Sequence, residues 1–206
     1  GGGPSNGSYS KRSELSDNRA EGAFTNGDER YYTLSFWPPS EIWDKATKYS
    51  TVISQWKQFG GGNPNFEVRL NSMGNYQITF RSVEHSVKEL TLGTAVPDQW
   101  NDLKYYVKNS EGNDGELKIW LNGELVYTYE GQTLYKRNQD GYFKFGMYTE
   151  FRDERILLFD GVRISNSLLG KSLEEWATDQ QDYPSVELTT PEDDTQIELG
   201  STINLL

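Results

Sequence analysis

One short segment carries the side chains best suited to chemistry. It reads Gly-Tyr-Phe-Lys-Phe-Gly-Met-Tyr over residues 141–148. As a strand, it would place the polar side chains of Tyr142, Lys144 and Tyr148 on one face and an apolar set on the other. Gly146 would let a ligand come close to that polar face. Phenols and an ammonium on one open surface suit proton transfer on an anionic substrate.

Two further segments of alternating polarity add charged and amide groups. Gln55 and Lys57 would share one face of a strand, while Trp56 between them would point into the core. Arg12 and Glu14 would share a face in the same way, and Glu14 could simply form a cross-strand ion pair there. Both segments add groups that could receive an anion.

Arg69 and Arg81 lie on the polar faces of two more predicted strands, where their charge could hold an anionic ligand. A plain structural role stays open for the other side chains. Lys57 and Lys144 could be ordinary solvated lysines, and Tyr148 could merely pack or hydrogen-bond within a sheet.

The composition supports a β-rich domain. The chain has 206 residues with 13 Tyr, 9 Phe, 6 Trp and 20 Gly, which is typical of short strands with aromatic faces and Gly-rich turns. That length suits one all-β domain, alone or with a fragment of another. The net charge of −11 argues against general nucleic-acid binding, although a local Lys/Arg cluster can still govern one site. The chain has no cysteine, hence no disulfide, and no apolar run of membrane-spanning length.

Alternation of period two recurs along the chain and predicts ten strands. They are residues 31–37, 51–57, 66–71, 76–81, 87–92, 103–108, 116–121, 124–129, 142–150 and 156–164. Asn122 and Gly123 predict a two-residue hairpin turn, and Ser172 predicts the N-cap of a helix over residues 172–178. Ten antiparallel strands predict an all-β sandwich of two sheets, a jelly roll or concanavalin-like variant, with a concave groove for a chain-like ligand.

Three motifs in this order resemble the signatures of jelly-roll polysaccharide lyases. They are Arg-Ser-Glu-Leu at residues 12–15, Gln-Trp-Lys at 55–57 and Tyr-Phe-Lys-Phe-Gly-Met-Tyr at 142–148. Alginate lyases of that group carry R-S/T-E-L, Q-I-H and Y-F-K-A-G-x-Y, and the heparin and glucuronan lyase relatives carry Q-W-H. Residues 100–123 also look like the concanavalin-type sandwich of that superfamily. The resemblance covers roughly residues 5–165, and the trio makes it specific, since one motif alone would be weak.

Lys57 departs from that pattern. It stands where the alginate and heparin-type enzymes have histidine, and the single histidine, His85, is interpreted as a surface residue near a turn. A lysine with a tyrosine looks instead like the jelly-roll ulvan lyases, marine bacterial enzymes that cut a sulfated rhamnose–uronate polymer. The resemblance therefore implies a Lys–Tyr site and favours ulvan as the substrate.

The resemblance implies a carbon–oxygen lyase that removes the C5 proton of a uronate and expels the 4-linked oxygen. Because the neighbouring carboxylate makes this proton weakly acidic, cationic or hydrogen-bonding groups must neutralise that carboxylate and stabilise the enolate-like state. Lys57, Gln55 and Arg12 suit this role. Tyr148 is the candidate for both general base and general acid. Its phenol, with an ordinary pKa of about 10, would need a cation such as Lys57 or Lys144 nearby to lower that pKa.

Other residues are expected to contact the sugar chain. Lys144, Arg69 and Arg81 would bind its anionic groups. Tyr106 and Trp120 fall on the polar sides of their strands, where they could stack on sugar rings.

The expected partner is an anionic polysaccharide, with no nucleic acid and no membrane. The protein is expected to be a monomer, secreted or held at a bacterial cell surface, and to require no cofactor. The acidic segments 113–115 and 192–194 could bind a structural calcium ion. Neither has the spacing of a defined calcium loop, and both are interpreted as solvated turns.

The sequence changes character after Tyr183 and Pro184. Residues 1–182 are interpreted as the catalytic jelly-roll domain, and residues 183–206 as a linker and the truncated start of an immunoglobulin-like module. The opening Gly-Gly-Gly-Pro without methionine suggests an excised piece whose targeting signal is missing.

Other functions stay open from the sequence. A non-catalytic carbohydrate-binding module could use the same sandwich, although it would not need Lys57 and Tyr148 together. A glycoside hydrolase would need a pair of carboxylates in the groove, and nothing pairs the candidates Glu14 and Glu150 convincingly. Among lyases, alginate and glucuronan are the alternative substrates.

Overall fold

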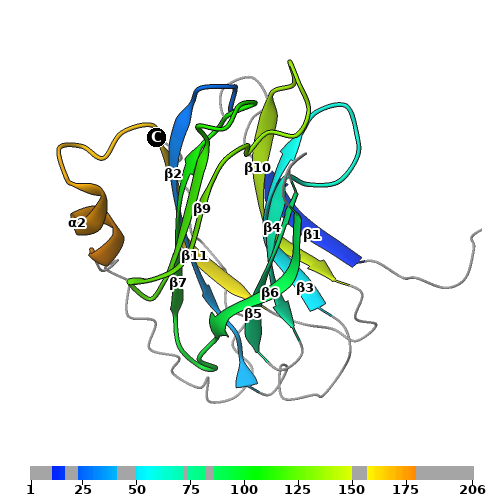
Figure 1. The fold of residues 1–206 in the computed structure, drawn as a ribbon. Helices are drawn as coiled ribbons and strands as arrows, with labels where there is room; N and C mark the ends of the chain where they lie inside the picture. The colour runs from blue at the N-terminus through cyan, green and yellow to red at the C-terminus, as the bar shows by residue number, and fades with distance from the viewer. Residues whose placement is uncertain are drawn as a thin grey trace, which may run out of the picture.

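Two antiparallel sheets lie face to face, and one short helix covers the outer side of one of them (Figure 1). The computed structural model describes residues 11–16, 23–40, 50–71, 74–81, 86–149 and 157–179. Sheet A has six strands in the order β1 (Lys11–Ser16), β10 (Gly141–Thr149), β3 (Ser50–Gln58), β4 (Phe66–Asn71), β5 (Asn75–Arg81) and β6 (Ser86–Thr94). Sheet B has five in the order β11 (Leu158–Ser165), β2 (Glu29–Trp37), β7 (Asn101–Lys108), β8 (Glu116–Leu121) and β9 (Glu124–Glu130). The predicted all-β sandwich is confirmed.

The predicted strands are all present, and their ends differ from the predicted ones by no more than two residues. The ten predicted strand ranges do not include β1, a short strand at the edge of sheet A. Asn122 and Gly123 have φ angles of 49° and 83°, as the turn of the β8–β9 hairpin requires. No helix in the described ranges is long and apolar enough to cross a membrane. The predicted module at 183–206 lies outside the described residues.

Aromatic side chains from both sheets fill the space between them. Trp56 of β3 is completely buried. Its ring stacks on Phe66 of β4 with centroids 4.0 Å apart, and it meets Tyr32 and Tyr105 of sheet B edge-on at 5.2 and 4.6 Å. Phe143 of β10 packs beside it at 4.7 Å. These contacts bury large apolar areas and confirm that Trp56 points into the core.

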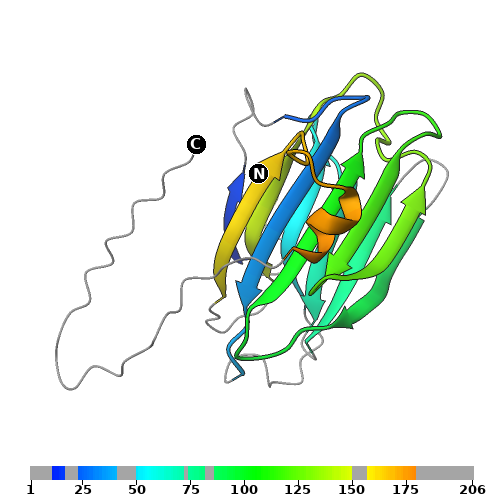
Figure 2. The ribbon, with the colours of Figure 1, turned by 90° about the vertical axis from the view of Figure 1, so that its left-hand side faces the viewer.

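The helix α2 (Leu173–Thr178) packs on the outer face of sheet B (Figure 2). Ser172 is its N-cap and forms a capping box, as predicted. Trp176 meets Trp120 edge-on at 5.8 Å, and both Trp120 and Tyr106 are only 7% exposed. These two rings lie beneath α2 and are not free to stack on a sugar.

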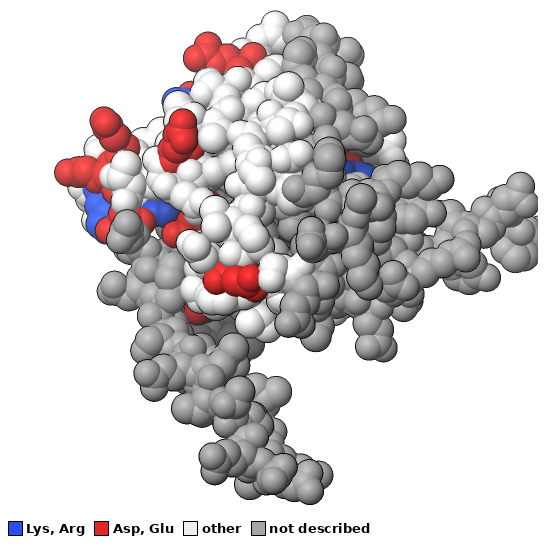
Figure 3. All heavy atoms as spheres, turned by 90° about the horizontal axis from the view of Figure 1, so that it is seen from below, with Lys and Arg blue, Asp and Glu red and all other residues white. Residues whose placement is uncertain are grey.

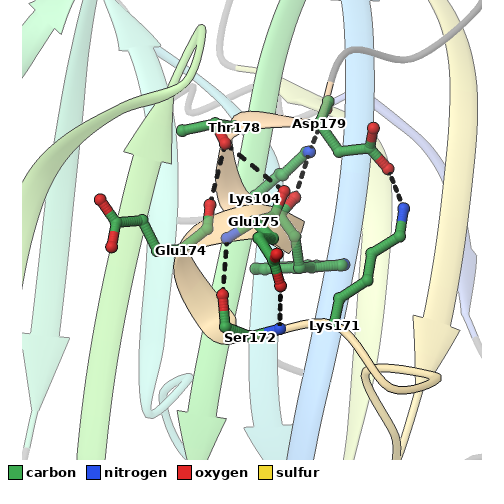
Figure 4. A network of polar contacts seen from close by, with 8 residues as sticks. Lys104, Lys171, Ser172, Glu174, Glu175, Thr178 and Asp179 are labelled. Carbon is green, nitrogen blue, oxygen red and sulfur yellow. Dashed lines mark hydrogen bonds and ion pairs between the residues drawn. The ribbon is translucent and has the colours of Figure 1, made fainter.

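One lysine of sheet B holds the end of this helix (Figure 4). Lys104 of β7 is 5% exposed, and its Nζ donates to the carbonyl oxygen of Trp176 at 2.7 Å and to that of Asp179. The Asp179 side chain also pairs with Lys171. Desolvation by burial lowers the pKa of Lys104. The last carbonyl oxygens of a helix have no N–H donor within the helix. The Lys104 ammonium supplies a donor to them.

Lys104→Met is expected to lower the free energy of unfolding by about 1–3 kcal/mol, because it leaves two carbonyl oxygens without a donor at similar side-chain volume. Urea unfolding would show a lower midpoint with an unchanged slope. Lys118→Met on β8 is the matched control. Lys118 pairs with Glu116 at a partly exposed position, where an ion pair contributes at most about 1 kcal/mol. Equal stability of Lys104→Met and the wild type would contradict this role.

Candidate active site

The outer face of sheet A faces away from sheet B and α2, and no described helix or strand covers it (Figure 1). The predicted site residues all lie on this sheet: Arg12 on β1, Lys144 and Tyr148 on β10, Gln55 and Lys57 on β3, Arg69 on β4 and Arg81 on β5. For Arg12 and Arg81 only the backbone is described. The strand order β1-β10-β3-β4-β5 therefore brings segments that are far apart in the sequence onto adjacent strands.

Tyr148 lies in a row of cross-strand neighbours that contains two arginines. In register it faces Arg12 of β1 on one side and Val52 of β3 on the other. Val52 in turn faces Arg69 of β4. Directly opposed residues have Cβ atoms about 5 Å apart. Arg12 is therefore adjacent to Tyr148, and Arg69 lies two strands away from it.

Gln55 lies at the centre of a second row. It faces Lys144 of β10 and Glu67 of β4, and its amide Nε2 donates to Oε1 of Glu14. The Lys144 ammonium lies 3.9 Å from Oε2 of Glu14. The predicted ion pair of Glu14 is therefore present, with Lys144 as the cation. Gln55 and Glu67 are buried, so this row is a polar network held against the sheet.

Most described cations of this face are paired with carboxylates. Arg69 donates to Oε1 of Glu67 from Nη2 at 2.8 Å and from Nε at 3.1 Å, and Lys144 pairs with Glu14. Such pairing reduces the positive field that an incoming anion meets. Within the described part of the chain, the Lys57 side chain has no hydrogen bond or ion pair. Among the described side chains, Lys57 is therefore the cation of this face most available to an anionic ligand.

Aromatic rings lie beside Lys57. Lys57 faces Tyr142 of β10 in register. The Tyr142 ring stacks on Phe59 with centroids 5.0 Å apart, and the Lys144 ammonium lies 5.4 Å from its centre. Tyr142 is only 7% exposed, so its ring is packed against Phe59 and the Lys144 ammonium and its phenol is not an open group.

Lys57 and Tyr148 are not cross-strand neighbours. Along β3, Lys57 lies five residues beyond Val52, the residue that faces Tyr148, which amounts to roughly 16 Å at about 3.3 Å per residue. Gln55 lies between them on the same strand. The register therefore places the expected catalytic pair at two ends of a site, with the amide of Gln55 in its middle.

Gly146 was predicted to let a ligand come close to the polar face, but the structure gives it a different role. Its φ is +128°, and a Cβ there would lie 2.3 Å from the carbonyl oxygen of Ser13 and 2.8 Å from Cα of Glu14. The register of β10 with β3 shifts between Phe145 and Tyr148, as at a β-bulge. The space beside Gly146 is taken by the backbone of β1, and the glycine allows that strand to approach closely.

The acidic turn at 113–115 is occupied by protein groups. Ser110 Oγ donates to Oδ1 of Asp114, and Lys108 Nζ lies 3.2 Å from Oδ2. The hydrogen bond from Ser110, followed by the contact with Lys108, lowers the pKa of Asp114. Within the described ranges, no three His, Cys, Asp or Glu side chains cluster as metal ligands would. Three further candidates lie outside the described residues: His85, Glu150 and the segment 192–194.

Glu67 belongs to the site although no motif contains it. Its side chain is 5% exposed and forms the ion pair with Arg69. Its position two residues before Arg69 on β4 places both on one face of the strand, and this spacing is the signal by which the sequence could have revealed it.

The acidic side chains of the described residues that are visible in Figure 3 lie mainly on its left, the side of α2 and sheet B.

The family of this chain is shown by its sequence. A family model described as polysaccharide lyase matches residues 2–163, which is most of the chain. The chain belongs to the polysaccharide lyase family. The resemblance of the three motifs to lyases is thus confirmed at the level of the family. No curated protein matches this lyase sequence.

Solved structures show the same fold at low sequence identity. The endo-β-1,4-glucuronan lyase of the fungus Trichoderma reesei has a TM-score of 0.64 and 18% identity, over 78% of this chain and 76% of the fungal one. An alginate lyase of Pseudomonas aeruginosa has a TM-score of 0.52 and 19% identity, over 76% of this lyase and 74% of that chain. The receptor binding domain of botulinum neurotoxin D has a TM-score of 0.50 and 14% identity, over 79% of this chain and 38% of that chain. These similarities establish the jelly-roll fold.

Proposed function

We propose that this lyase cleaves a uronate-containing anionic polysaccharide by β-elimination and leaves an unsaturated uronate at the new chain end. The observation that carries this proposal is the outer face of sheet A. In a chain of the lyase family, it presents a phenol, an amide and a lysine that has no ion pair among the described residues, all along neighbouring strands. A sandwich with a purely structural sheet does not need this set of groups on one face.

Each step of the reaction has a candidate residue. Tyr148, as the phenolate, takes the C5 proton of the uronate, and the electron pair of that bond forms the C4=C5 double bond while the C4–O bond breaks. The same phenol then returns the proton to the leaving oxygen. Lys57 and Gln55 stabilise the charge that develops on the uronate carboxylate. Gln55 lies between the positions of Lys57 and Tyr148 along β3, so its amide is central to the proposed site.

Ulvan is the first proposed substrate. The support is Lys57, which stands where the alginate and heparin-type motifs have histidine. Glucuronan is the second candidate, and it is favoured by the TM-score of 0.64 with the fungal glucuronan lyase. The two polymers share a charged uronate, so the site chemistry is the same for both and the neighbouring sugar differs.

One assay tests the reaction and ranks the substrates. The protein is incubated separately with ulvan, glucuronan, alginate and heparin, and the ultraviolet absorbance of the unsaturated uronate is followed. We expect product from ulvan, or from glucuronan if the second candidate is correct. Binding to a polymer without any product would instead identify a carbohydrate-binding module.

The remaining properties are proposed on the same basis. The lyase domain spans residues 1–182, and residues 183–206 begin an immunoglobulin-like module. The protein acts as a monomer outside the cell or at its surface and needs no cofactor. Full activity in the presence of a chelator would support the last point, and loss of activity that calcium restores would refute it.

A further inference from the structure

Glu14 reaches across a neighbouring strand to the centre of the site. It lies on β1, whereas its hydrogen-bond partner Gln55 lies on β3, with β10 between the two strands. Strands in a sheet are about 4.8 Å apart, so the contact spans two such spacings. Glu14 faces Gly146 of β10 in register. From this position the Glu14 side chain crosses β10 to reach Gln55 on β3.

The Glu14 carboxylate lies in a nearly buried position, where an ionised group loses most of its hydration. Its side chain is only 6% exposed, and taking a carboxylate out of water costs several kcal/mol unless partners compensate. The partners of this carboxylate include the Lys144 ammonium at 3.9 Å and the amide of Gln55. An apolar or small residue at the edge of a sheet would avoid this cost, so the fold alone does not account for the carboxylate.

The contact fixes the direction of the Gln55 amide. An ionised carboxylate can only accept hydrogen bonds, so Gln55 must turn its nitrogen, not its oxygen, toward Glu14. One of the two N–H groups is used in this contact. The other stays as a donor for a ligand carboxylate. Without Glu14, the amide could rotate and present its oxygen to an anionic substrate, which would repel it.

We infer that Glu14 is a positioning residue of the lyase: it holds the amide of Gln55 with an N–H donor toward the uronate carboxylate. This role deepens the β-elimination proposed above and rests on it. Glu14 does not touch the sugar. It acts through Gln55, and Lys144 balances its charge.

A double-mutant cycle tests this role. Glu14→Gln keeps the shape of the side chain but lets the Gln55 amide rotate. It is expected to lower kcat by about 10- to 100-fold with little change in KM. This loss is smaller than the one expected when a donor to the transition state is itself removed. Since Glu14 acts through Gln55, the variant Glu14→Gln/Gln55→Ala should be no slower than Gln55→Ala alone. Glu14→Asp should recover part of the rate. Glu124→Gln, an exposed carboxylate of β9, is the matched control and should keep full activity.

A second measurement is independent of catalysis. The side-chain amide signals of Gln55 in the ¹⁵N-labelled protein, assigned with Gln55→Ala, should shift in Glu14→Gln and stay unchanged in Glu124→Gln. Two results would overturn the inference without affecting the proposed lyase activity. One is unchanged Gln55 amide signals in Glu14→Gln, and the other is a double variant whose loss of kcat equals the product of the losses in the two single variants. Absence of product from the wild type on every polymer would overturn the proposed function itself.

Discussion

Replacement of Tyr148 by phenylalanine is expected to abolish the formation of unsaturated product and to leave the fold intact. The change removes only the hydroxyl group, while the half-buried ring keeps its place in β10. General acid–base catalysis by one positioned group contributes about 10²–10⁴-fold. Because the proposed mechanism uses the same hydroxyl for both the removal of the C5 proton and the protonation of the leaving oxygen, the loss should lie at the upper end of that range.

The measurement is the initial rate of absorbance increase on the preferred polymer, together with the midpoint of thermal unfolding. Tyr127→Phe is a suitable control, since Tyr127 is a partly buried tyrosine of β9 on sheet B. That variant should keep its activity. A Tyr148→Phe enzyme that still forms product at more than a small fraction of the wild-type rate would refute the assignment, whatever its stability.

Local alternation is sufficient to predict the strands of this fold. In β4, whose ends match the predicted range, the alternate side chains of Phe66, Val68 and Leu70 lie in the core, so a period of two can be read within a few residues. The ends of β8 also match the predicted range. The order of strands is a different matter. The position of β10 between β1 and β3 results from how both sheets share the core around Trp56, and no local pattern encodes it.

The same distinction explains the site. The motifs name residues that the structure places on one face of sheet A, because each motif alternates as a strand does. The distance between Lys57 and Tyr148 depends on register shifts, one in β3 between Val52 and Ser54 and one in β10 near Gly146. A bulge changes the pairing of two strands without changing the composition of either. The ion pairs of Lys144 and Arg69 depend on that pairing, so the sequence could not show which cations are compensated.

The fold by itself does not establish the chemistry. The same sandwich occurs in the receptor binding domain of botulinum neurotoxin D, with a TM-score of 0.50, as well as in glucuronan and alginate lyases. A sheet face becomes a catalytic site only through its side chains. For this lyase the proposed catalytic groups are Tyr148, Gln55 and Lys57, and substitutions of these residues test the function more sharply than any comparison of folds.

Lys57→Met is expected to lower kcat by about 10²-fold or more, because loss of a group that stabilises developing charge in a water-poor site commonly costs 10²–10³-fold. The reason to single out Lys57 is its lack of a carboxylate partner among the described residues. Lys144 and Arg69 each form an ion pair with a glutamate. Lys57 has no such pair among the described residues, so its ammonium is the one we expect to contact the substrate. Methionine keeps most of the side-chain volume, so stability should change little.

The division of this effect between kcat and KM decides what Lys57 binds. If Lys57 neutralises the carboxylate of the uronate that loses its proton, kcat falls and KM changes little. If the roughly 16 Å between the positions of Lys57 and Tyr148 along the strand instead places Lys57 at a neighbouring sugar, KM rises at constant kcat, and the Lys–Tyr assignment is wrong. Lys118→Met on sheet B should change neither constant. Lys57→Arg sharpens the comparison, since it keeps the charge and should retain more of kcat than methionine only if charge is what the reaction requires.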